Sequence, residues 1–212
     1  HHFGYVGVAC EKRWERARYA AFSAALAKGG GTCMEYLPPR GWSAQTNWER
    51  TQDDLIKWLH SMPKPAGIMT AHDSLGVQVL DACRRGGIRV PDDIAVVSVD
   101  NDPVLCELAS PPLSSLDQNA QRLGYEAAAM LDAMMRGEKV EPGNFFFEPG
   151  EVVVRQSSDV IAVKDPRVSR AIRFIRENAC RSIDGSAVAK AAGLSRRALE
   201  KKFRAVTGST PM

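Results

Sequence analysis

The segment "AGIMTAHDSLGVQVLDACRRGGIRVPDDIAVVSVD", residues 66–100, reads as a strand, a helix and a second strand. Its two ends are short, nearly continuous apolar runs, which are typical of strands covered on both faces. The middle has the length of a crossover helix, and Gly86 and Gly87 follow it as helix-ending residues. Two strands joined by a helix predict a parallel pair.

The rest of the first 155 residues continues this alternation. Strands are expected at residues 2–9 ("HFGYVGVA"), 33–37 ("CMEYL"), 144–149 ("NFFFEP") and 151–158 ("EVVVRQSS"), and helices at residues 14–28, 47–62 and 118–136. The last of these helices carries an apolar stripe. The fold class predicted for this part is α/β with a mainly parallel sheet.

Net charge is unevenly distributed along the chain. Residues 164–212 hold twelve Lys and Arg against four Asp and Glu, whereas residues 1–163 hold sixteen against twenty-one. This asymmetry favours a polyanion as the partner of the basic end alone. No apolar run is long enough to cross a bilayer, so no membrane partner is expected.

The basic end has the pattern of a small all-α domain. Asp165 and Pro166 predict the start of a helix, a short helix follows Asp184, and Gly193 marks a tight turn. Ser195 then caps a third helix. The residues of that helix expected to face inward are Ala198, Leu199, Phe203 and Val206. A glycine turn between two short helices is typical of a helix-turn-helix.

The outward face of the third helix is strongly basic. Long cationic side chains at these positions can reach base edges and phosphates in the major groove of DNA. The alternative is the solvated face of an ordinary amphipathic helix. The expected DNA contacts are Ser195, Arg196, Arg197, Glu200, Lys201 and Arg204.

The five cysteines are an odd number with no C-x-x-C pair, which favours reduced thiols over a disulfide framework or a zinc site. The sequence contains no phosphate loop, no nucleophile elbow and no histidine pair with metal spacing. We therefore expect no cofactor, no metal and no enzymatic activity.

The stretch "IDGSAVAKAAGLSRRALEKKFRAVTGSTP", residues 183–211, resembles the first helix-turn-helix of the AraC/XylS family of bacterial transcription activators. The A-x-x-x-G-[LM]-S turn, the basic helix ending in Phe and the following G-x-[ST]-P carry the resemblance. In that family a linker helix and a second helix-turn-helix follow, so the resemblance implies a chain that holds only the first half of the DNA-binding domain.

The upstream part resembles the effector domain of LacI/GalR regulators, which have the periplasmic-binding-protein fold. The resemblance rests on "FGYVGV" (3–8), "RYAAF" (18–22), "TAHDSLGVQVLDACRRGGIRVPDDIAVVSVDN" (70–101) and "SSLDQNAQRLGYEAA" (114–128). It implies a partial sugar-binding domain at residues 1–155, mainly one lobe, a linker at 156–165, and the AraC-type domain at 166–212. The first lobe is expected to precede residue 1, and the helix at residues 118–136 to be packed less deeply than that at 74–85.

The resemblance also implies sugar-binding residues. Arg18 occupies the arginine of the R-x-x-G-F pattern, here R-Y-A-A-F, so that Ala21 replaces the glycine. Asp73 and Asp100 follow or end apolar strands, where ligands bind in open parallel sheets. Each aspartate has an alternative role as a helix cap or turn residue. Trp14 and Glu11, in or beside the loop after the first strand, are further candidates, and Trp14 could equally belong to the core.

A LacI-type sensor joined to an AraC-type reader implies a cytoplasmic, nucleoid-associated transcription activator. Its expected effector is a pentose such as D-xylose, and its expected partners are double-stranded operator or promoter DNA, a second copy of the chain and RNA polymerase. Two alternatives are a carbohydrate-binding protein of the same fold with no DNA role, and an enzyme of the doubly wound class. The basic helix argues against the first, since a pure sugar-binding protein has no use for it.

Overall fold

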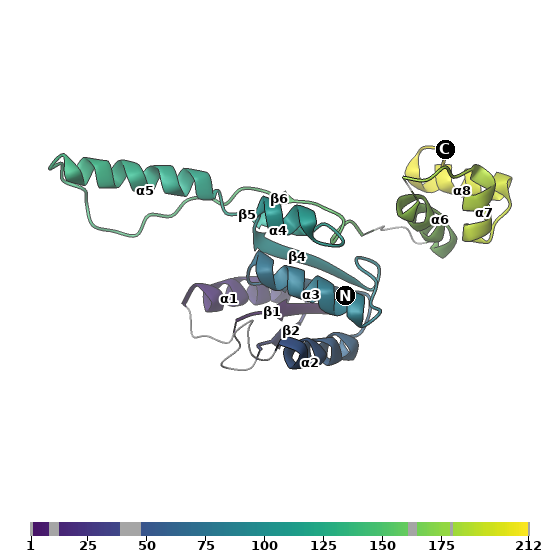
Figure 1. The fold of residues 1–212 in the computed structure, drawn as a ribbon, viewed down its shortest axis with the longest axis horizontal. Helices are drawn as coiled ribbons and strands as arrows, with labels where there is room; N and C mark the ends of the chain where they lie inside the picture. The colour runs from purple at the N-terminus through teal and green to yellow at the C-terminus, as the bar shows by residue number, and fades with distance from the viewer. Residues whose placement is uncertain (1, 9–12, 39–47, 161–164, 179, 212) are drawn as a thin grey trace. The chain divides into compact units, whose positions relative to one another are not determined.

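The computed structural model describes residues 2–8, 13–38, 48–160, 165–178 and 180–211. The chain divides into two compact units, His1–Val160 and Ile161–Met212 (Figure 1). Unit 1 is built on one sheet in the order β2-β1-β3-β4-β5-β6. Its strands are β1 (His2–Val6), β2 (Cys33–Tyr36), β3 (Ala66–Thr70), β4 (Ile94–Asp100), β5 (Ser114–Asp117) and β6 (Val152–Val153).

The first five strands of the sheet are parallel, and only β6 pairs antiparallel, with β5. The predicted α/β class and parallel sheet are therefore confirmed. The chain moves from β1 outward to β2 and then back to β3 on the other side of β1. Such a reversal of strand order leaves a crevice at the carboxyl ends of the strands.

The helices of unit 1 are α1 (Arg13–Lys28), α2 (Trp48–Ser61), α3 (Asp73–Arg85), α4 (Pro103–Leu108) and α5 (Ala120–Met135). Of these, α1 and α2 lie on opposite faces of the sheet. A Cβ on Gly4 would lie 2.8 Å from the Trp58 ring of α2, so β1 and α2 approach too closely for a larger residue. The next residue, Tyr5, is fully buried and its ring packs against Tyr19 and Phe22 of α1. Successive residues of β1 thus face α2 and α1 in turn, as the strand period requires.

The main core of unit 1 lies between the sheet and helices α2 and α3. Its fully buried members include Leu59 of α2, Val79 of α3 and Ile94 and Val96 of β4. Burial on both faces explains the continuous apolar character of β4 that the sequence displays.

Helix α5 differs from the other long helices, because none of its residues is buried, whereas seven residues of α3 are. Leu131 and Met134 of its apolar stripe are 58% and 60% exposed. In Figure 1 this helix extends away from the sheet. The prediction that it is packed less deeply than the helix at 74–85 is confirmed.

Two of the strands expected in unit 1 need correction, and two elements of unit 1 were not expected. No strand forms at residues 144–149, where Phe146 is 90% exposed, and the strand expected at 151–158 shrinks to β6. Strand β5 and the short helix α4 were not expected. The serines of β5 hid it, since Ser114 and Ser115 are polar residues that lie fully buried in the sheet.

Unit 2 consists of α6 (Pro166–Glu177), α7 (Gly185–Ala192) and α8 (Arg196–Thr207). Its buried core is formed by Val168, Ala171, Val188, Ala189, Ala192, Leu199 and Phe203. Alanines at three of these seven positions allow the helices to approach closely.

The expected caps of unit 2 are confirmed. The side chains of Asp165, Asp184 and Ser195 each accept a backbone N–H from the first turn of the helix that follows. Gly193 ends α7 with φ 64°, a left-handed conformation that glycine adopts without strain. One inward position was wrong: Val206 is 45% exposed. It lies one turn beyond Phe203, outside the core cluster of this unit.

Candidate sugar site and basic helix

The candidate ligand site of unit 1 lies at the carboxyl edge of its sheet. Because β1, β3, β4 and β5 are parallel, the residues that end or follow these strands meet at one edge. His72 follows β3, Asp100 ends β4 and Gln118 follows β5. The first turns of α1 contribute Trp14 and Arg18 to the same place.

Arg18 and Asp100, both predicted from the sequence, are brought together. A guanidinium nitrogen of Arg18 lies 3.9 Å from Oδ1 of Asp100, and another donates a hydrogen bond to the carbonyl of Ala71. The side chains are 23% and 40% exposed, so both are partly accessible. An arginine donor beside a carboxylate acceptor is a pair that can bind neighbouring hydroxyl groups.

The electrostatics of Asp100 reflect its partial enclosure. Burial raises the pKa of the Asp100 carboxyl, the nearby Asp73 adds to the rise, and the Arg18 guanidinium opposes it. Gln118 donates a hydrogen bond to Oδ1 of the same carboxylate. The backbone at Asp100 has φ 118° and at Asn101 φ 55°, and strained residues of this kind cluster at ligand sites.

Trp14 lies beside this pair rather than in the core. It is 41% exposed, and its ring lies 4.9 Å from the guanidinium carbon of Arg18. The ring centroids of Trp14 and His72 are 6.4 Å apart. A partly exposed indole at this edge offers an apolar face on which a sugar ring could stack.

Sequence analysis missed His72 and Gln118. Gln118 appeared there only as the first residue of a helix, because β5 was not recognised and its carboxyl end was therefore not placed at the edge of the sheet. One sequence pattern could have indicated both residues, namely a polar side chain within two residues of the end of a strand. Glu11 was also expected at this site, but it lies outside the described residues.

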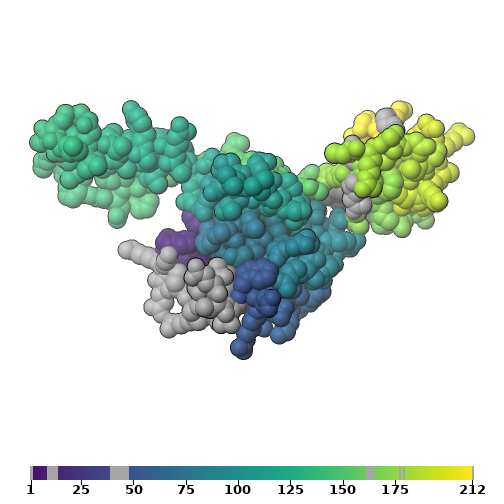
Figure 2. All heavy atoms as spheres, in the orientation of Figure 1, coloured from purple at the N-terminus to yellow at the C-terminus, as the bar shows by residue number. Residues whose placement is uncertain are grey.

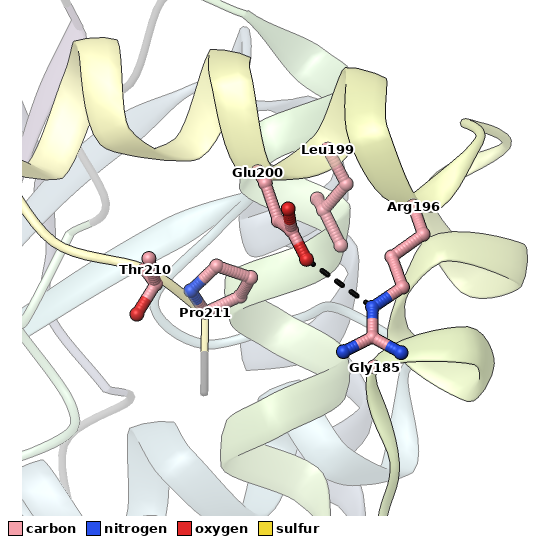
Figure 3. Close-up of a pocket in the computed structure, with 6 residues that line it drawn as sticks. All are labelled: Gly185, Arg196, Leu199, Glu200, Thr210 and Pro211. Atoms are coloured by element: carbon pink, nitrogen blue, oxygen red, sulfur yellow. Dashed lines mark hydrogen bonds and ion pairs between the residues drawn. The ribbon is translucent and has the colours of Figure 1, made fainter.

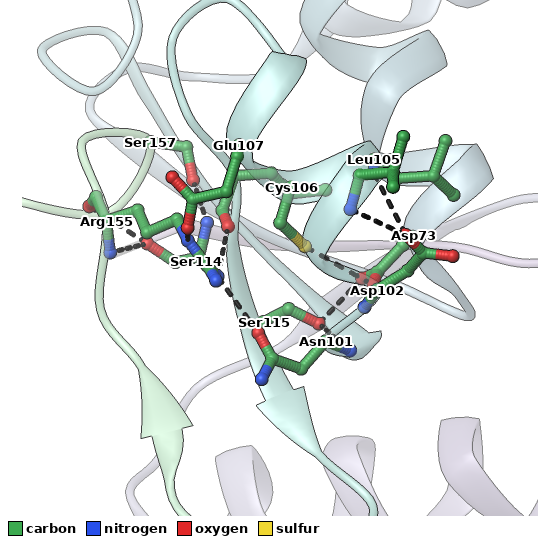
Figure 4. A network of polar contacts seen from close by, with 12 residues as sticks. Asp73, Asn101, Asp102, Leu105, Cys106, Glu107, Ser114, Ser115, Arg155 and Ser157 are labelled. Atoms are coloured by element: carbon green, nitrogen blue, oxygen red, sulfur yellow. Dashed lines mark hydrogen bonds and ion pairs between the residues drawn. The ribbon is translucent and has the colours of Figure 1, made fainter.

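Asp73 has a different environment from Asp100. It is 1% exposed, and its carboxylate accepts hydrogen bonds from the backbone N–H of Asp102 at 2.7 Å and the hydroxyl of Ser115 at 2.6 Å. The thiol of Cys106 lies 3.3 Å from the same carboxylate. Figure 4 shows these contacts converging on Asp73. The Asp73 side chain thus binds the loop after β4, whereas the Asp100 carboxylate is partly exposed.

The six residues of α8 expected to contact DNA are all exposed in unit 2. They differ in whether their side chains already have partners within the protein. The hydroxyl of Ser195 caps α8 by accepting the backbone N–H of Ala198 at 3.3 Å. The guanidinium of Arg196 lies 3.2 Å from Glu200 and packs over Gly185 at the start of α7, beside a pocket of about 210 Å³ (Figure 3).

Three of the remaining basic residues of α8 line one surface depression. It is bordered by Arg197, Glu200, Lys201, Arg204, Ala205 and Thr210. Lys202 points elsewhere: its ammonium group pairs with Asp165, the cap of α6. The helix thus separates cations that serve the fold from cations that form a positive outer face.

The described part of the chain contains no group of three or more His, Cys, Asp or Glu residues arranged to hold a metal ion. Cys33, Cys83, Cys106 and Cys180 are free thiols, although Cys180 is exposed and Cys33 is half-buried rather than buried. None of the helices described is both long and apolar enough to cross a membrane.

The chain is 33% identical over 201 residues to the xylose operon regulatory protein of Escherichia coli (strain K12), a match that covers 94% of this chain and 50% of the relative. It is 35% identical over 158 residues to the protein of the same name from Haemophilus influenzae, covering 74% of this chain and 41% of that protein. The chain thus spans about half the length of these relatives, or less.

Among solved structures, that of the xylose-binding transcription activator xylR aligns with 99% of this chain and 55% of its own, with a TM-score of 0.77 and 31% identity. The model of the periplasmic binding protein-like domain matches residues 1–158, which include the whole sheet and the candidate sugar site. The chain therefore belongs to the family of periplasmic binding protein-like domains.

Proposed function

We propose that this chain is the sensing and DNA-reading part of a sugar-responsive transcription regulator, with a pentose such as D-xylose as effector. The observation that carries the proposal is the Arg18–Asp100 pair beside Trp14, at the carboxyl edge of a periplasmic-binding-protein-like sheet. The names of the relatives, xylose operon regulatory proteins, support the choice of sugar.

In this proposal each side chain has a distinct task. Arg18 donates hydrogen bonds to sugar hydroxyls, Asp100 accepts them, and Trp14 stacks on the ring. Gln118 and His72 add donors and acceptors at the rim. The 3.9 Å contact between Arg18 and Asp100 is longer than a hydrogen bond. A sugar hydroxyl placed between the two side chains would be bound by two charged groups. Each such hydrogen bond contributes about 1.5–3 kcal/mol.

The sugar assignment is tested by calorimetric titration of the chain with D-xylose, L-arabinose and D-ribose. Asp100→Asn keeps the shape of the side chain and removes its charge, so pentose affinity should fall at least about tenfold, or 1.4 kcal/mol. Asp54→Asn on α2 is the matched control, because the Asp54 side chain is also 40% exposed and also pairs with a cation, Lys57.

Two results would count against the assignment. Binding of a pentose with equal affinity by the wild-type chain and Asp100→Asn would remove Asp100 from the site. Failure of every pentose to bind the wild-type chain would reject the sugar proposal as a whole.

We further propose that α7 and α8 form the first helix-turn-helix of an AraC-type DNA-binding domain, with α8 in the major groove. Support comes from the left-handed turn at Gly193, the Ser195 cap and the exposed cations of α8. Because Arg196 leans on Glu200 and Gly185, we assign phosphate and base contacts chiefly to Arg197, Lys201 and Arg204. Arg196 reaches DNA only if its pair with Glu200 opens.

DNA binding is tested by fluorescence anisotropy with duplexes selected from a random-sequence pool. Loss of a base contact should weaken binding to the selected site by about 1–3 kcal/mol, while loss of a phosphate contact lowers the salt slope by about 1 on all sequences. The variants are Arg196→Ala, Arg197→Ala and Arg204→Ala. Arg84→Ala, which removes one ion-paired cation from unit 1, is the control. Binding unchanged in all three α8 variants would reject the assignment.

The proposed partners are double-stranded operator or promoter DNA, a sugar, a second copy of the chain and RNA polymerase, in a cytoplasmic protein associated with the nucleoid. No catalytic step is proposed. The exposed apolar stripe of α5 suits a further lobe of the sensor, in keeping with relatives about twice as long as this chain. A sugar-binding chain that ignored DNA in the anisotropy experiment would instead support the alternative of a carbohydrate-binding protein.

A further inference from the structure

Arg155 occupies an unusual place at the end of unit 1. Its side chain is 12% exposed, and Nε donates to Oε1 of Glu107 at 2.8 Å. Its Nη1 donates to the side-chain oxygen of Asn101 and to the carbonyl of Leu113, both at 3.0 Å. An arginine with this many protein partners is held in one position, because releasing it would leave several acceptors unpaired.

Two buried serines fix the backbone around Arg155. The hydroxyl of Ser114 accepts the Arg155 N–H at 2.7 Å. The hydroxyl of Ser157 donates to the carbonyl of Val96 at 2.7 Å and accepts the N–H of Ser114 at 2.8 Å. Both serines are fully buried. The segment 155–157 is therefore attached to β4 and β5 by these side-chain contacts and by a backbone hydrogen bond from the Val96 N–H to the Ser157 carbonyl at 2.8 Å. Figure 4 shows the contacts around Arg155 and Ser114.

The same network reaches the candidate sugar site. Asn101, which accepts from Arg155, directly follows Asp100, and its own N–H donates to the hydroxyl of Ser115 at 3.0 Å. Ser115 in turn donates to Asp73 at 2.6 Å. The two strained residues at the end of β4, Asp100 and Asn101, are thus held by Asp73 through Ser115 and by Arg155.

The position of Arg155 along the chain gives this contact a second meaning. Unit 1 ends at Val160, five residues after Arg155, and the chain then continues into unit 2. Arg155 is therefore the residue through which the segment leaving unit 1 contacts the strand end that carries Asp100.

We infer that Arg155 is a positioning residue that couples occupation of the sugar site to the segment leading to the basic unit. The inference rests on the proposed function. A ligand that binds Asp100 stabilises one arrangement of the Asp100–Asn101 backbone, and a ligand shifts an equilibrium only through such differential contacts. Arg155 transmits that arrangement, because its bond to Asn101 forms only when the loop is in place. Residues 155–157 are then held more firmly when sugar is bound.

Amide hydrogen exchange of the full chain, with and without D-xylose, tests this coupling. In the wild-type chain the sugar should slow exchange of the Arg155 and Ser157 amides by at least about fivefold, the lower end of typical coupling between sites. Arg155→Met retains most of the side-chain volume and removes every donor of the guanidinium. It should still bind D-xylose, at most about tenfold more weakly, and lose the sugar-dependent slowing.

A second variant, Asn101→Gly, keeps the test valid if Arg155→Met does not fold. A third variant, Arg89→Met, is the control. Asn101→Gly deletes the acceptor of the Arg155 bond, and glycine adopts the φ of 55° found there without strain; it should also lose the slowing. Arg89→Met removes an arginine paired with Asp93 in the turn before β4 and should keep the wild-type response.

The outcomes distinguish failure of sugar binding from failure of the role of Arg155. If the wild-type chain binds no pentose, the proposed function fails and the ligand-dependent coupling fails with it. If the wild-type chain binds D-xylose, and both Arg155→Met and Asn101→Gly show the wild-type slowing at residues 155–157, the sugar site stands and the role of Arg155 is overturned. Loss of the slowing in Arg89→Met as well would also overturn it, since the effect would not be specific to Arg155.

Discussion

Glu15 is a buried acid next to the candidate sugar site that the site itself does not use. The residue is fully buried, and no described residue donates a hydrogen bond to either carboxylate oxygen. The carboxylate lies so close to the backbone of Gly7 that a Cβ there would fall 2.3 Å from Oε1. Burial raises the pKa of Glu15, and Arg16 opposes the rise. An unpaired buried charge of this kind costs free energy at neutral pH.

We therefore expect Glu15→Met to stabilise the chain at pH 7. Because folding raises the pKa of Glu15, its protonated form stabilises the folded chain at pH values below the unfolded pKa, near 4.5. This stabilisation is lost as the pH rises through the pKa of the folded state. The gain in unfolding free energy should be about 1–3 kcal/mol at neutral pH and should shrink as the pH falls toward the unfolded pKa. Urea unfolding followed by circular dichroism measures both.

The same substitution at Glu49, an acid in the exposed first turn of α2, is the control for Glu15. It should change stability by no more than about 0.5 kcal/mol. A gain for Glu15→Met that did not depend on pH would show that the benefit comes from added apolar contact and not from removal of a buried charge.

At the scale of elements, the Asp165–Lys202 pair connects the start of α6 to the middle of α8. Asp165 has two tasks, because one carboxylate oxygen accepts the N–H of Arg167 as a helix cap and the other accepts from Lys202. The hydrogen bond from Lys202, followed by that from Arg167, lowers the pKa of Asp165. The pair thus orients the basic helix relative to α6.

We expect Asp165→Ala to destabilise unit 2 more than Asp165→Asn, because asparagine can still cap α6 and alanine cannot. A lowered pKa means that the stabilisation is present above the unfolded pKa of the acid and is lost as the pH falls through the folded value. The destabilisation should therefore diminish in acid. Calorimetric unfolding over a pH series measures this, with Asp132→Asn on the exposed helix α5 as control. Equal effects of Ala and Asn at Asp165 would show that the cap contributes nothing.

At the scale of the whole molecule, the chain has separate cores in its two units. The large cluster around Leu59 belongs to unit 1, and the cluster around Leu199 belongs to unit 2. Each unit buries its own apolar residues, so we expect two unfolding transitions by differential scanning calorimetry. Leu59→Ala should shift only the transition of unit 1, and Leu199→Ala only that of unit 2. Each substitution should lower the unfolding free energy of its own unit by about 2–5 kcal/mol. A single transition shifted by both substitutions would contradict this independence.

Much of this architecture follows from local sequence. Apolar runs separated by helices predicted the parallel strands β1 to β4, and Asp165, Asp184 and Ser195 marked helix starts in unit 2 that the structure confirms. These features depend on hydrogen bonds and periodicity within a few residues, so they can be predicted from the amino-acid sequence alone. Arg18 and Asp100 were assigned to one candidate site through family resemblance, and their contact is visible only in the structure.

Tertiary structure decided what depends on residues far apart in the chain. β5 is a strand although it is rich in serine, because residues 155–157 satisfy its buried hydroxyl and backbone groups. The position of β5 beside β4 also brought Gln118 to Asp100 in the candidate sugar site and placed Ser115 against the buried Asp73. Asp73 and Asp100 look alike in sequence, each at the end of an apolar strand. Only the tertiary contacts determine that the Asp100 carboxylate is partly exposed beside Arg18, while the Asp73 carboxylate is buried against Asp102 and Ser115.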